Sequence, residues 1–485
     1  MRKNIINILL AAIILLSGCI NEELLNTDNN IVQFSLKNTS EEFFAKINKD
    51  TISFTIPIET DITQLTASIK IPYKSEISPE INELTNWSKL NELTITSENG
   101  DIQIYKIKIL QNFTNEDINI TCQKDLDKYK NIETVNGSVT IGKSIGLDSI
   151  SDLSNLNALK KVKYNLIINS TYKETQLKEL CNIEELGGII INECLIDTIN
   201  LPKLKLVKTD ININNITNLK NISFKQLSYI GGNFKSSNCY KIRDILLPGL
   251  TKINKGIHIS NNYELKIIDL KKLKAVNDEI HFENLELLGT IKLPSLTNIG
   301  KGLYLSRLGF VEFELQNLES IIGSLTIKAC RDIEEIDFPN LNSIGNNLVI
   351  EYCSELRTLN LPLIEDLNNL SLDTFDELKK LNISKLNTIK NKLYIRQLYR
   401  FSDLEAFTSI HSIGLIELNN NNRLTNIDGF RNIKNINSIK FNYNRNLSNF
   451  CGFQPEALTN IEEYIIEDNK YNPNLEDLQT GHCSE

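Results

Sequence analysis

The sequence has little of several residue types on which common functions depend. Its 485 residues include only four histidines and one tryptophan, and none of its nine cysteines forms a Cys-x-x-Cys motif. Few histidines limit the number of imidazole-based metal or acid–base sites, and the missing motif argues against a thiolate zinc site or a thioredoxin-like site. The formal net charge of −9 provides no basic excess for phosphate contacts. We therefore expect no nucleic-acid partner.

Apolar residues, in contrast, are plentiful. Hydrophobic residues make up 41% of the chain and charged residues 23%. This balance is ordinary for a folded protein and too apolar for a disordered one. The length alone suggests about three domains, a prior that a repeat architecture would override.

The N-terminus has the pattern of a secretion signal. Two basic residues precede a mainly apolar run, residues 4–16, which is shorter than the about 20 residues that span a membrane. The run ends in Leu-Ser-Gly-Cys at residues 16–19, which resembles the lipobox of bacterial lipoproteins. The resemblance implies a signal peptide over residues 1–18 and a lipid on Cys19. The alternative is an uncleaved anchor helix.

Two acidic residues follow the lipobox. Glu22 and Glu23 resemble the signal that sends some lipoproteins to the outer face of the outer membrane. Residues 19–30 are polar and lack periodicity, so we expect them to form a tether. The predicted location is the bacterial outer membrane, with the chain lipid-anchored and displayed on the cell surface.

Residues 31–112 alternate between apolar and polar positions, as strands with one buried face do. Asn99-Gly100 separates two such segments, and this dipeptide is a strong hairpin signal. The pattern predicts a small β-sandwich, which resembles the immunoglobulin-like modules next to the anchor of bacterial surface lipoproteins. We expect Trp87 in its core rather than on a sugar-binding surface.

The remainder of the chain is one long repeat. An apolar–variable–apolar triplet recurs every 22 or 23 residues after a first interval of 27. The triplets begin at Val139, Leu166, Ile189, Ile211, Phe234, Ile257, Ile280, Leu303, Leu325, Leu348, Leu370, Leu393, Ile416 and Ile439. Five residues after the start, seven turns carry asparagine or cysteine: Cys194, Cys239, Asn262, Cys330, Cys353, Asn421 and Asn444.

This spacing is the leucine-rich-repeat core L-x-L-x-x-[N/C]-x-x-L. We expect the asparagines and cysteines to point inward and to bond backbone groups where each strand turns. Leu-Pro pairs such as Leu247-Pro248 disfavour helix on the return path of the turn. The prediction is a mainly β fold, with a β-helix-like solenoid of 22–23-residue turns over residues 139–450.

Residues 341–350 are similar to the repeats of receptor L-domain proteins, and residues 118–141 resemble their N-terminal cap. The resemblance implies a solenoid cap over residues 118–138 and a closing cap over residues 451–485. It is specific for the register of the repeat and does not extend to a ligand.

The cysteines divide by position. Cys451 and Cys483 both fall in the closing cap, and we predict a disulfide bond between them. Whether Cys122 and Cys181 pair at the other end stays open. The cysteines of the inward column are expected to be buried thiols, with a bond between neighbouring turns as the less favoured alternative.

One motif matches a familiar pattern by letters alone. Residues 137–144 fit the P-loop consensus G-x-x-x-x-G-K-S. The motif needs a loop between a buried strand and a helix, whereas its middle residues here coincide with the first repeat strand. We expect neither a nucleotide nor any other cofactor.

The middle residue of each triplet faces out of the sheet. This row, with the residue just beyond it, supplies the candidate ligand-binding residues His258, His281, Tyr304, Tyr394 and Arg396. The two histidines fall in consecutive turns, about 5 Å apart. A solvated face is the preferred interpretation, and a surface metal site or a pH-sensitive patch is the alternative. Because no third converging ligand is assured, we assign no metal site.

No Ser–His–Asp or Cys–His order stands out, nor does a carboxylate pair suited to glycoside hydrolysis, so we predict no catalytic residues and no enzyme. A rigid stack of exposed strands suits an extended partner. We predict a monomeric surface protein that binds an extracellular protein or glycan. The alternatives are a structural spacer or adhesin without a specific ligand and, third, a glycan-directed hydrolase.

Overall fold

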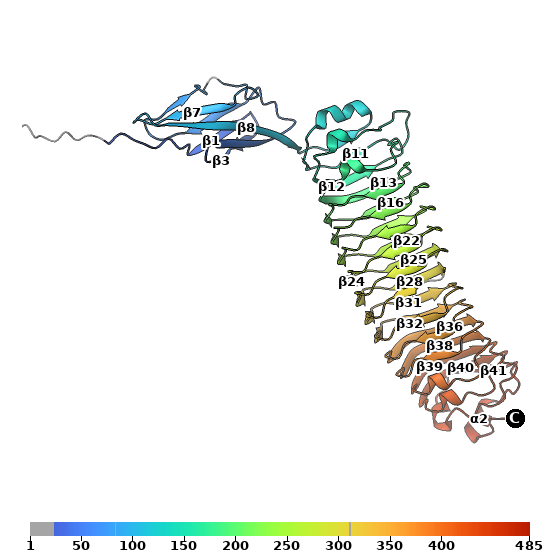
Figure 1. Cartoon of the computed structure of the whole chain (residues 1–485). Helices are drawn as coiled ribbons and strands as arrows, with labels where there is room; N and C mark the ends of the chain where they lie inside the picture. Colours follow the sequence, from blue (N-terminus) through green and yellow to red (C-terminus); the bar gives the residue numbers. More distant parts are fainter. Residues whose placement is uncertain (1–23, 83, 310–311) are drawn as a thin grey trace, which may run out of the picture. The chain divides into compact units, whose positions relative to one another are not determined.

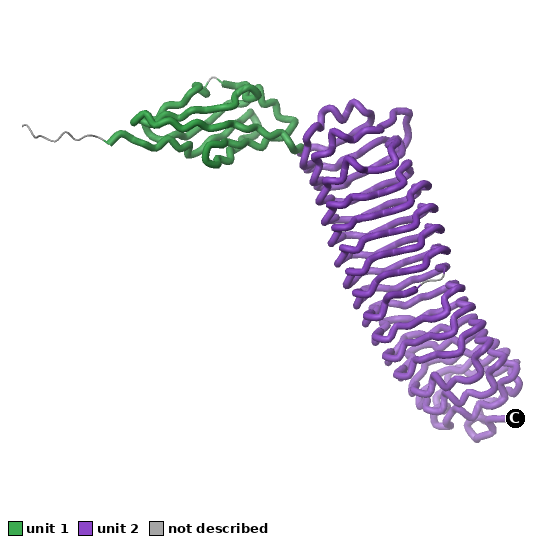
Figure 2. Tube along the Cα trace, viewed as in Figure 1, with its two compact units in different colours: residues 1–114 green, residues 115–485 purple. Residues whose placement is uncertain are grey.

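The computed structural model describes residues 24–82, 84–309 and 312–485. The chain divides into two compact units, with the boundary in the sequence between Thr114 and Asn115 (Figure 2). The expected signal peptide and Cys19 lie outside the described residues. Within the described part, no helix has the length and apolar character needed to cross a membrane.

The first unit is a small β-sandwich around an aromatic core. Phe34 and Phe54 come from different sheets, and their ring centroids lie 5.1 Å apart. Trp87 is buried against Phe34 and donates a hydrogen bond from Nε1 to the carbonyl of Leu65 at 2.9 Å, as expected for a core residue. One sheet contains β1 (Gln33–Lys37), β2 (Glu42–Phe44) and β5 (Thr66–Lys70); the other contains β3 (Lys46–Asn48), β4 (Thr51–Pro57), β6 (Glu76–Ser78), β7 (Glu92–Thr96) and β8 (Ile102–Thr114).

The second unit is a solenoid, which confirms the predicted mainly β fold (Figure 1). Each turn adds one strand to a long parallel sheet, and the triplets pair in register, for example Ile257 with Ile280 and Ile280 with Leu303. The strands are β9 (Ile118–Ile120), β11 (Val139–Ile141), β12 (Lys161–Ile168), β13 (Glu185–Asn192), β16 (Ile211–Asn214), β19 (Phe234–Ser237), β22 (Ile257–Ser260), β25 (Ile280–Leu285), β28 (Leu303–Leu308), β31 (Leu325–Lys328), β34 (Asn347–Glu351), β36 (Asp366–Phe375), β38 (Thr388–Leu398), β39 (Ser412–Asn419), β40 (Asn435–Asn442) and β41 (Glu463–Glu467).

The return path of the central turns is also strand-like, as predicted. It consists of two further parallel sheets. The first sheet contains β14 (Thr198–Asn200), β17 (Asn221–Ser223), β20 (Asp244–Leu246), β23 (Ile267–Asp269), β26 (Thr290–Lys292) and β29 (Glu312–Glu314). The second sheet contains β32 (Glu335–Asp337), β35 (Thr358–Asn360) and β37 (Lys380–Asn382). Short strands precede the main ones: β10 (Thr134–Val135), β15 (Leu206–Val207), β18 (Tyr229–Ile230), β21 (Lys252–Ile253), β24 (Ala275–Val276), β27 (Asn298–Ile299), β30 (Ser320–Ile321) and β33 (Ser343–Ile344).

Helical turns occur toward the two ends of the solenoid. The 3₁₀ turns are η1 (Gln123–Tyr129), η2 (Ser154–Leu156), η3 (Lys178–Leu180), η4 (Glu405–Phe407), η5 (Asp428–Phe430) and η6 (Pro455–Leu458). Among the described residues, α2 (Leu475–Thr480) is the one α-helix, and it belongs to the C-terminal end. The strand β11 occupies the middle of the P-loop-like segment, so that segment is not the loop that phosphate binding requires.

The asparagines of the inward column are buried and bond the backbone of the preceding turn, as predicted. Asn444 donates from Nδ2 to the carbonyl of Leu418 at 3.1 Å, and its Oδ1 accepts the N–H of Asn421 at 2.9 Å. Asn421 and Asn469 repeat this pattern one turn to either side. The amide thus replaces hydrogen bonds that the backbone loses where each strand turns.

Cysteines in the same column are buried thiols with weaker contacts. The Cys239 sulfur lies 3.5 Å from the carbonyl of Ser237. Burial raises the pKa of Cys239 to about 11 and that of Cys353 to about 12, so both stay protonated at neutral pH. These thiols therefore serve packing rather than nucleophilic chemistry.

The disulfide bond between Cys451 and Cys483 is present, as predicted. Cys122 and Cys181, whose pairing the sequence left open, are free thiols. Cys122 precedes η1 and Cys181 follows η3, while η2 packs between these two turns. The two cysteines are thus two turns apart, and two turns of about 4.8 Å each add up to more than the Cα separation of about 7 Å that a disulfide tolerates. Cys330 and Cys353 in neighbouring turns are also free.

Candidate functional site

From β13 to β40, the strands of the long parallel sheet end in a sharp corner. Four residues after the triplet start, the backbone adopts a left-handed conformation, with φ between +50° and +60°, at Glu193, Asn215, Asn238, Asn261, Asn284, Arg307, Ala329, Tyr352, Thr374, Gln397, Asn420 and Tyr443. The corners stack along the solenoid, and we call this line the strand-end edge. Asparagine tolerates a left-handed backbone better than most residues, which explains its frequency there.

Asparagines on this edge form a ladder of side-chain hydrogen bonds. Asn261 donates from Nδ2 to Oδ1 of Asn238 at 3.0 Å, and Asn284 donates to Asn261 at 2.6 Å. At the next turn, Nη1 of Arg307 donates to Oδ1 of Asn284 at 3.2 Å. The ladder therefore ends on a guanidinium group that is held at a defined position.

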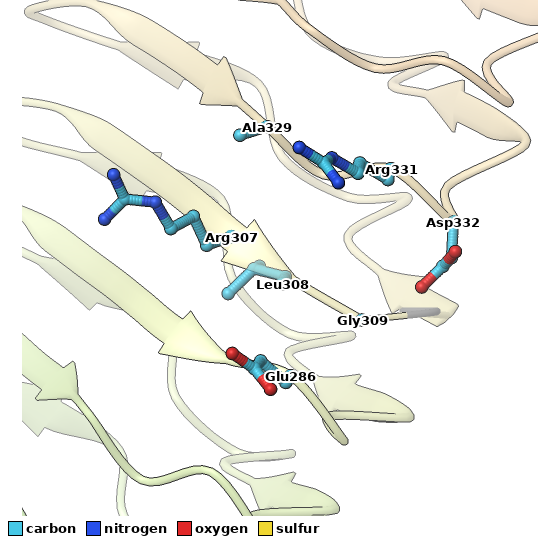
Figure 3. A pocket seen from close by; sticks show the side chains of 7 residues that line it. All are labelled: Glu286, Arg307, Leu308, Gly309, Ala329, Arg331 and Asp332. Carbon is cyan, nitrogen blue, oxygen red and sulfur yellow. The ribbon is translucent and has the colours of Figure 1, made fainter.

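Arg307 lines a surface pocket of about 280 Å³. Figure 3 shows side chains from successive turns around it: Glu286, Arg307, Leu308, Gly309, Ala329, Arg331 and Asp332. Within the described part of the chain, the ion pairs do not include Glu286, Arg331 or Asp332. The pocket thus offers a cationic donor and two carboxylate acceptors that no internal ion pair engages.

A stacked pair of tyrosines lies on the same edge. Tyr240 and Tyr263 each stand six residues after a triplet start, as do Glu286 and Arg331. Their ring centroids are 5.6 Å apart with an interplanar angle of 11°, and the residues are 45% and 41% exposed. The same position one turn after Tyr263 is occupied by Glu286, which lines the pocket, so Tyr263 lies one turn away from the pocket lining.

The outward strand face carries three of the five predicted ligand-binding residues together. His258 in β22, His281 in β25 and Tyr304 in β28 pair in register. The His281 and Tyr304 ring centroids lie 4.4 Å apart, and those of the two histidines 6.2 Å apart. We call these three residues the histidine row.

Carboxylates accompany the histidine row. Oε1 of Glu279 is 3.5 Å from Nδ1 of His258, and Oε2 of Glu283 is 3.4 Å from Nε2 of His281. Burial lowers the pKa of His258, and the attraction of Glu279 only partly offsets this. The other carboxylate oxygen of Glu283 lies 3.7 Å from Nη1 of Arg307, which connects the row to the pocket.

Tyr394 and Arg396 do not join this group. They lie in β38, four strands beyond β28, or about 19 Å along the sheet. Nε of Arg396 is 3.6 Å from Oδ1 of Asp373, and Nζ of Lys392 lies 4.6 Å from the centroid of the Tyr394 ring. Asp373 is almost completely buried, and this burial raises the pKa of its carboxyl group. The predicted residues therefore form two patches rather than one site.

Reasoning from the sequence missed the strand-end edge. Tyr240, Tyr263, Arg307 and Arg331 fall outside the triplets, where the alternation of strand side chains no longer indicates a direction. The recurring asparagines four residues after the triplet start were the available signal, because that residue type favours left-handed corners. When the repeats are aligned by their triplet starts, the residues just beyond these corners fall in the same columns and therefore lie along one edge.

Comparison with known proteins identifies the first unit most clearly. Residues 31–109 match the family model described as SGBP, N-terminal. No curated protein matches the chain. Among solved structures, a leucine-rich repeat protein from Bacteroides ovatus ATCC 8483 is 12% identical over 89% of this chain and 91% of its own, with a TM-score of 0.28. A TLR13–ssRNA13 complex matches at 14% identity over 75% of this chain and 74% of that chain, with a TM-score of 0.20.

Proposed function

We propose that the chain is a non-catalytic cell-surface protein that binds a glycan along the strand-end edge of its solenoid. The observation that carries this proposal is the stacked pair of Tyr240 and Tyr263 beside the charged pocket. Exposed aromatic rings suit the apolar faces of sugar rings. The guanidinium groups of the pocket can donate hydrogen bonds to sugar hydroxyls, and its carboxylate groups can accept hydrogen bonds from them.

The match of residues 31–109 supports the same class of ligand and the same location. The SGBP family is one of glycan-binding proteins, and it suggests a place at the cell surface. The lipobox-like end of the N-terminal segment supports attachment to the outer membrane through a lipid on Cys19. In this proposal the tether of residues 19–30 and the immunoglobulin-like sandwich of residues 31–112 connect the anchor to the solenoid.

The strand face extends the proposed surface. Arg307 lines the pocket and also lies beside Glu283, which contacts His281. A ligand on the strand-end edge can therefore also reach His281 and the neighbouring Tyr304. Tyr394 and Arg396 provide a second patch for a glycan of several sugar units, since about 19 Å separates the two groups. The proposal assigns these groups stacking and hydrogen bonding, and no reaction.

Affinity electrophoresis of the purified chain in gels containing soluble plant, fungal and animal polysaccharides tests the proposal. We expect one polysaccharide class to retard the chain, and the Tyr240→Ala/Tyr263→Ala variant to bind it at least about tenfold more weakly, because two stacking contacts are lost. Tyr73→Ala is the matched control, since Tyr73 is 78% exposed and belongs to the first unit, outside the proposed surface.

The control should bind like the wild type, and far-UV circular dichroism should show that all variants fold. Equal binding by the tyrosine-pair variant and the wild type would contradict the proposed site. If no polysaccharide binds, while a protein from matrix extract binds in a manner that depends on Arg331, a protein ligand replaces the glycan. If neither binds, the spacer alternative gains support.

A further inference from the structure

Three side chains that bind metals elsewhere in proteins meet on the outward strand face. One ligand atom each of His258, Glu279 and His281 lies within 4.8 Å of the others, and all three residues are half-buried. The sequence indicated two stacked histidines without an assured third ligand. The third ligand is Glu279, which immediately precedes β25 and reaches back to His258 in the previous turn.

We propose that His258, Glu279 and His281 bind one divalent transition-metal ion of the zinc type, with a further coordination position open to solvent. Ligand atoms of a tetrahedral zinc site lie about 3.4 Å apart, since each bond is about 2.1 Å long. Small side-chain rotations bring atoms within 4.8 Å to that separation. Two imidazoles favour zinc, nickel or copper over calcium and magnesium, which prefer oxygen ligands.

The fold holds these ligands on rigid supports. His258 and His281 are direct neighbours in the parallel ladder of β22 and β25, so their backbone positions are fixed. Around His281, the Tyr304 ring packs at 4.4 Å and Glu283 approaches Nε2 at 3.4 Å. Groups that contact metal ligands in this way orient them and raise affinity.

The inference does not rest on the proposed glycan function, because its three ligands need neither the tyrosine pair nor the pocket. Metal binding without glycan binding, or the reverse, would separate the two proposals. The Tyr240→Ala/Tyr263→Ala variant should keep full zinc affinity, since both tyrosines lie outside the cluster.

The test uses the untagged full-length chain, stripped with EDTA and exchanged into metal-free buffer. Isothermal titration with zinc chloride should give one ion per chain, and calcium chloride should give no binding. His281→Ala and Glu279→Gln should each weaken zinc binding at least about tenfold. His411→Ala is the matched control, because this exposed histidine lies outside the cluster, and its zinc affinity should stay within about twofold of the wild type.

Three results would overturn the inference: no stoichiometric zinc binding, undiminished binding by both cluster variants, or calcium binding as tight as zinc binding. If a cluster variant does not fold, His258→Gln replaces it. Anomalous scattering at the zinc edge from crystals grown with zinc must place the ion between the three side chains. An ion at any other position would also disprove the assignment.

Discussion

At the strand ends, the residues that face the interior of the solenoid repeat from turn to turn, whereas the residues that face the solvent vary. Inside, Asn421 and Asn444 repeat one pattern of hydrogen bonds to the preceding turn. Outside, the column six residues after the triplet start changes from Tyr263 to Glu286 to Arg331 within a few turns. The inside is constrained by buried backbone groups that need partners, whereas water can satisfy the outside. Irregular outward residues on a regular frame are therefore the place to look for binding.

The largest expected effect comes from breaking the inner pattern. Asn444→Leu leaves the carbonyl of Leu418 and the N–H of Asn421 without their side-chain partner in a fully buried position. Each buried unsatisfied group costs about 1–3 kcal/mol, so for the two groups we expect a loss of about 2–6 kcal/mol in the free energy of unfolding. Urea unfolding followed by circular dichroism measures it.

Two further variants calibrate that result. Asn444→Cys should lose less, because thiols occupy the same column at Cys330 and Cys353. Asn437→Leu changes an exposed asparagine of β40, the strand that precedes Asn444, and should shift the urea midpoint little. Equal midpoints for Asn444→Leu and Asn437→Leu would mean that the inner amides do not stabilise the turns.

A smaller effect is expected at the corner itself. Tyr352 adopts φ +58°, a left-handed backbone that a bulky residue tolerates poorly, where several other turns use asparagine. Tyr352→Asn should raise the free energy of unfolding by about 0.5–1 kcal/mol, and the reverse change Asn420→Tyr should lower it by a similar amount. Thermal unfolding measures both. A destabilised Tyr352→Asn would show that the tyrosine ring contributes more by packing than its backbone costs.

The periodic part of the fold was predictable because parallel pairing fixes register. Ile257, Ile280 and Leu303 align since a one-residue slip would turn every apolar side chain outward. The end strands β9 and β41 were missed because their spacing differs: Ile118 to Val139 is 21 residues and Ile439 to Tyr464 is 25. Pattern reasoning is therefore strongest where the turn length repeats.

The candidate sites were predictable only in part, because only the residues within the repeating strands follow a regular pattern. The histidine row follows from strand alternation, which sets the direction of His258 and His281. The corner at Arg307 has no asparagine to indicate its left-handed backbone, so the pocket behind it could not be predicted. The position of Glu279 depends on its side-chain torsions, which sequence patterns do not determine.

The last and smallest expected effect concerns Asp373, which faces outward yet is nearly buried. Burial raises the pKa of its carboxyl group above the unfolded value of about 3.9, although the hydrogen bond from Thr374 and the charge of Arg396 oppose this. The folded chain then holds the proton more tightly than the unfolded chain. Stability is therefore lost as pH rises from below about 3.9 through the raised pKa, and it stays lower above it.

Asp373→Asn mimics the protonated group, so its melting temperature should exceed that of the wild type at pH 7 and approach it near pH 3. Asp366→Asn, on an exposed carboxylate of the same strand, controls for the removed charge. A constant difference between Asp373→Asn and the wild type from pH 3 to 8 would contradict the burial argument. If the gain at pH 7 appears, the outward face carries a charge that the fold does not need, beside Arg396, where a binding surface would use it.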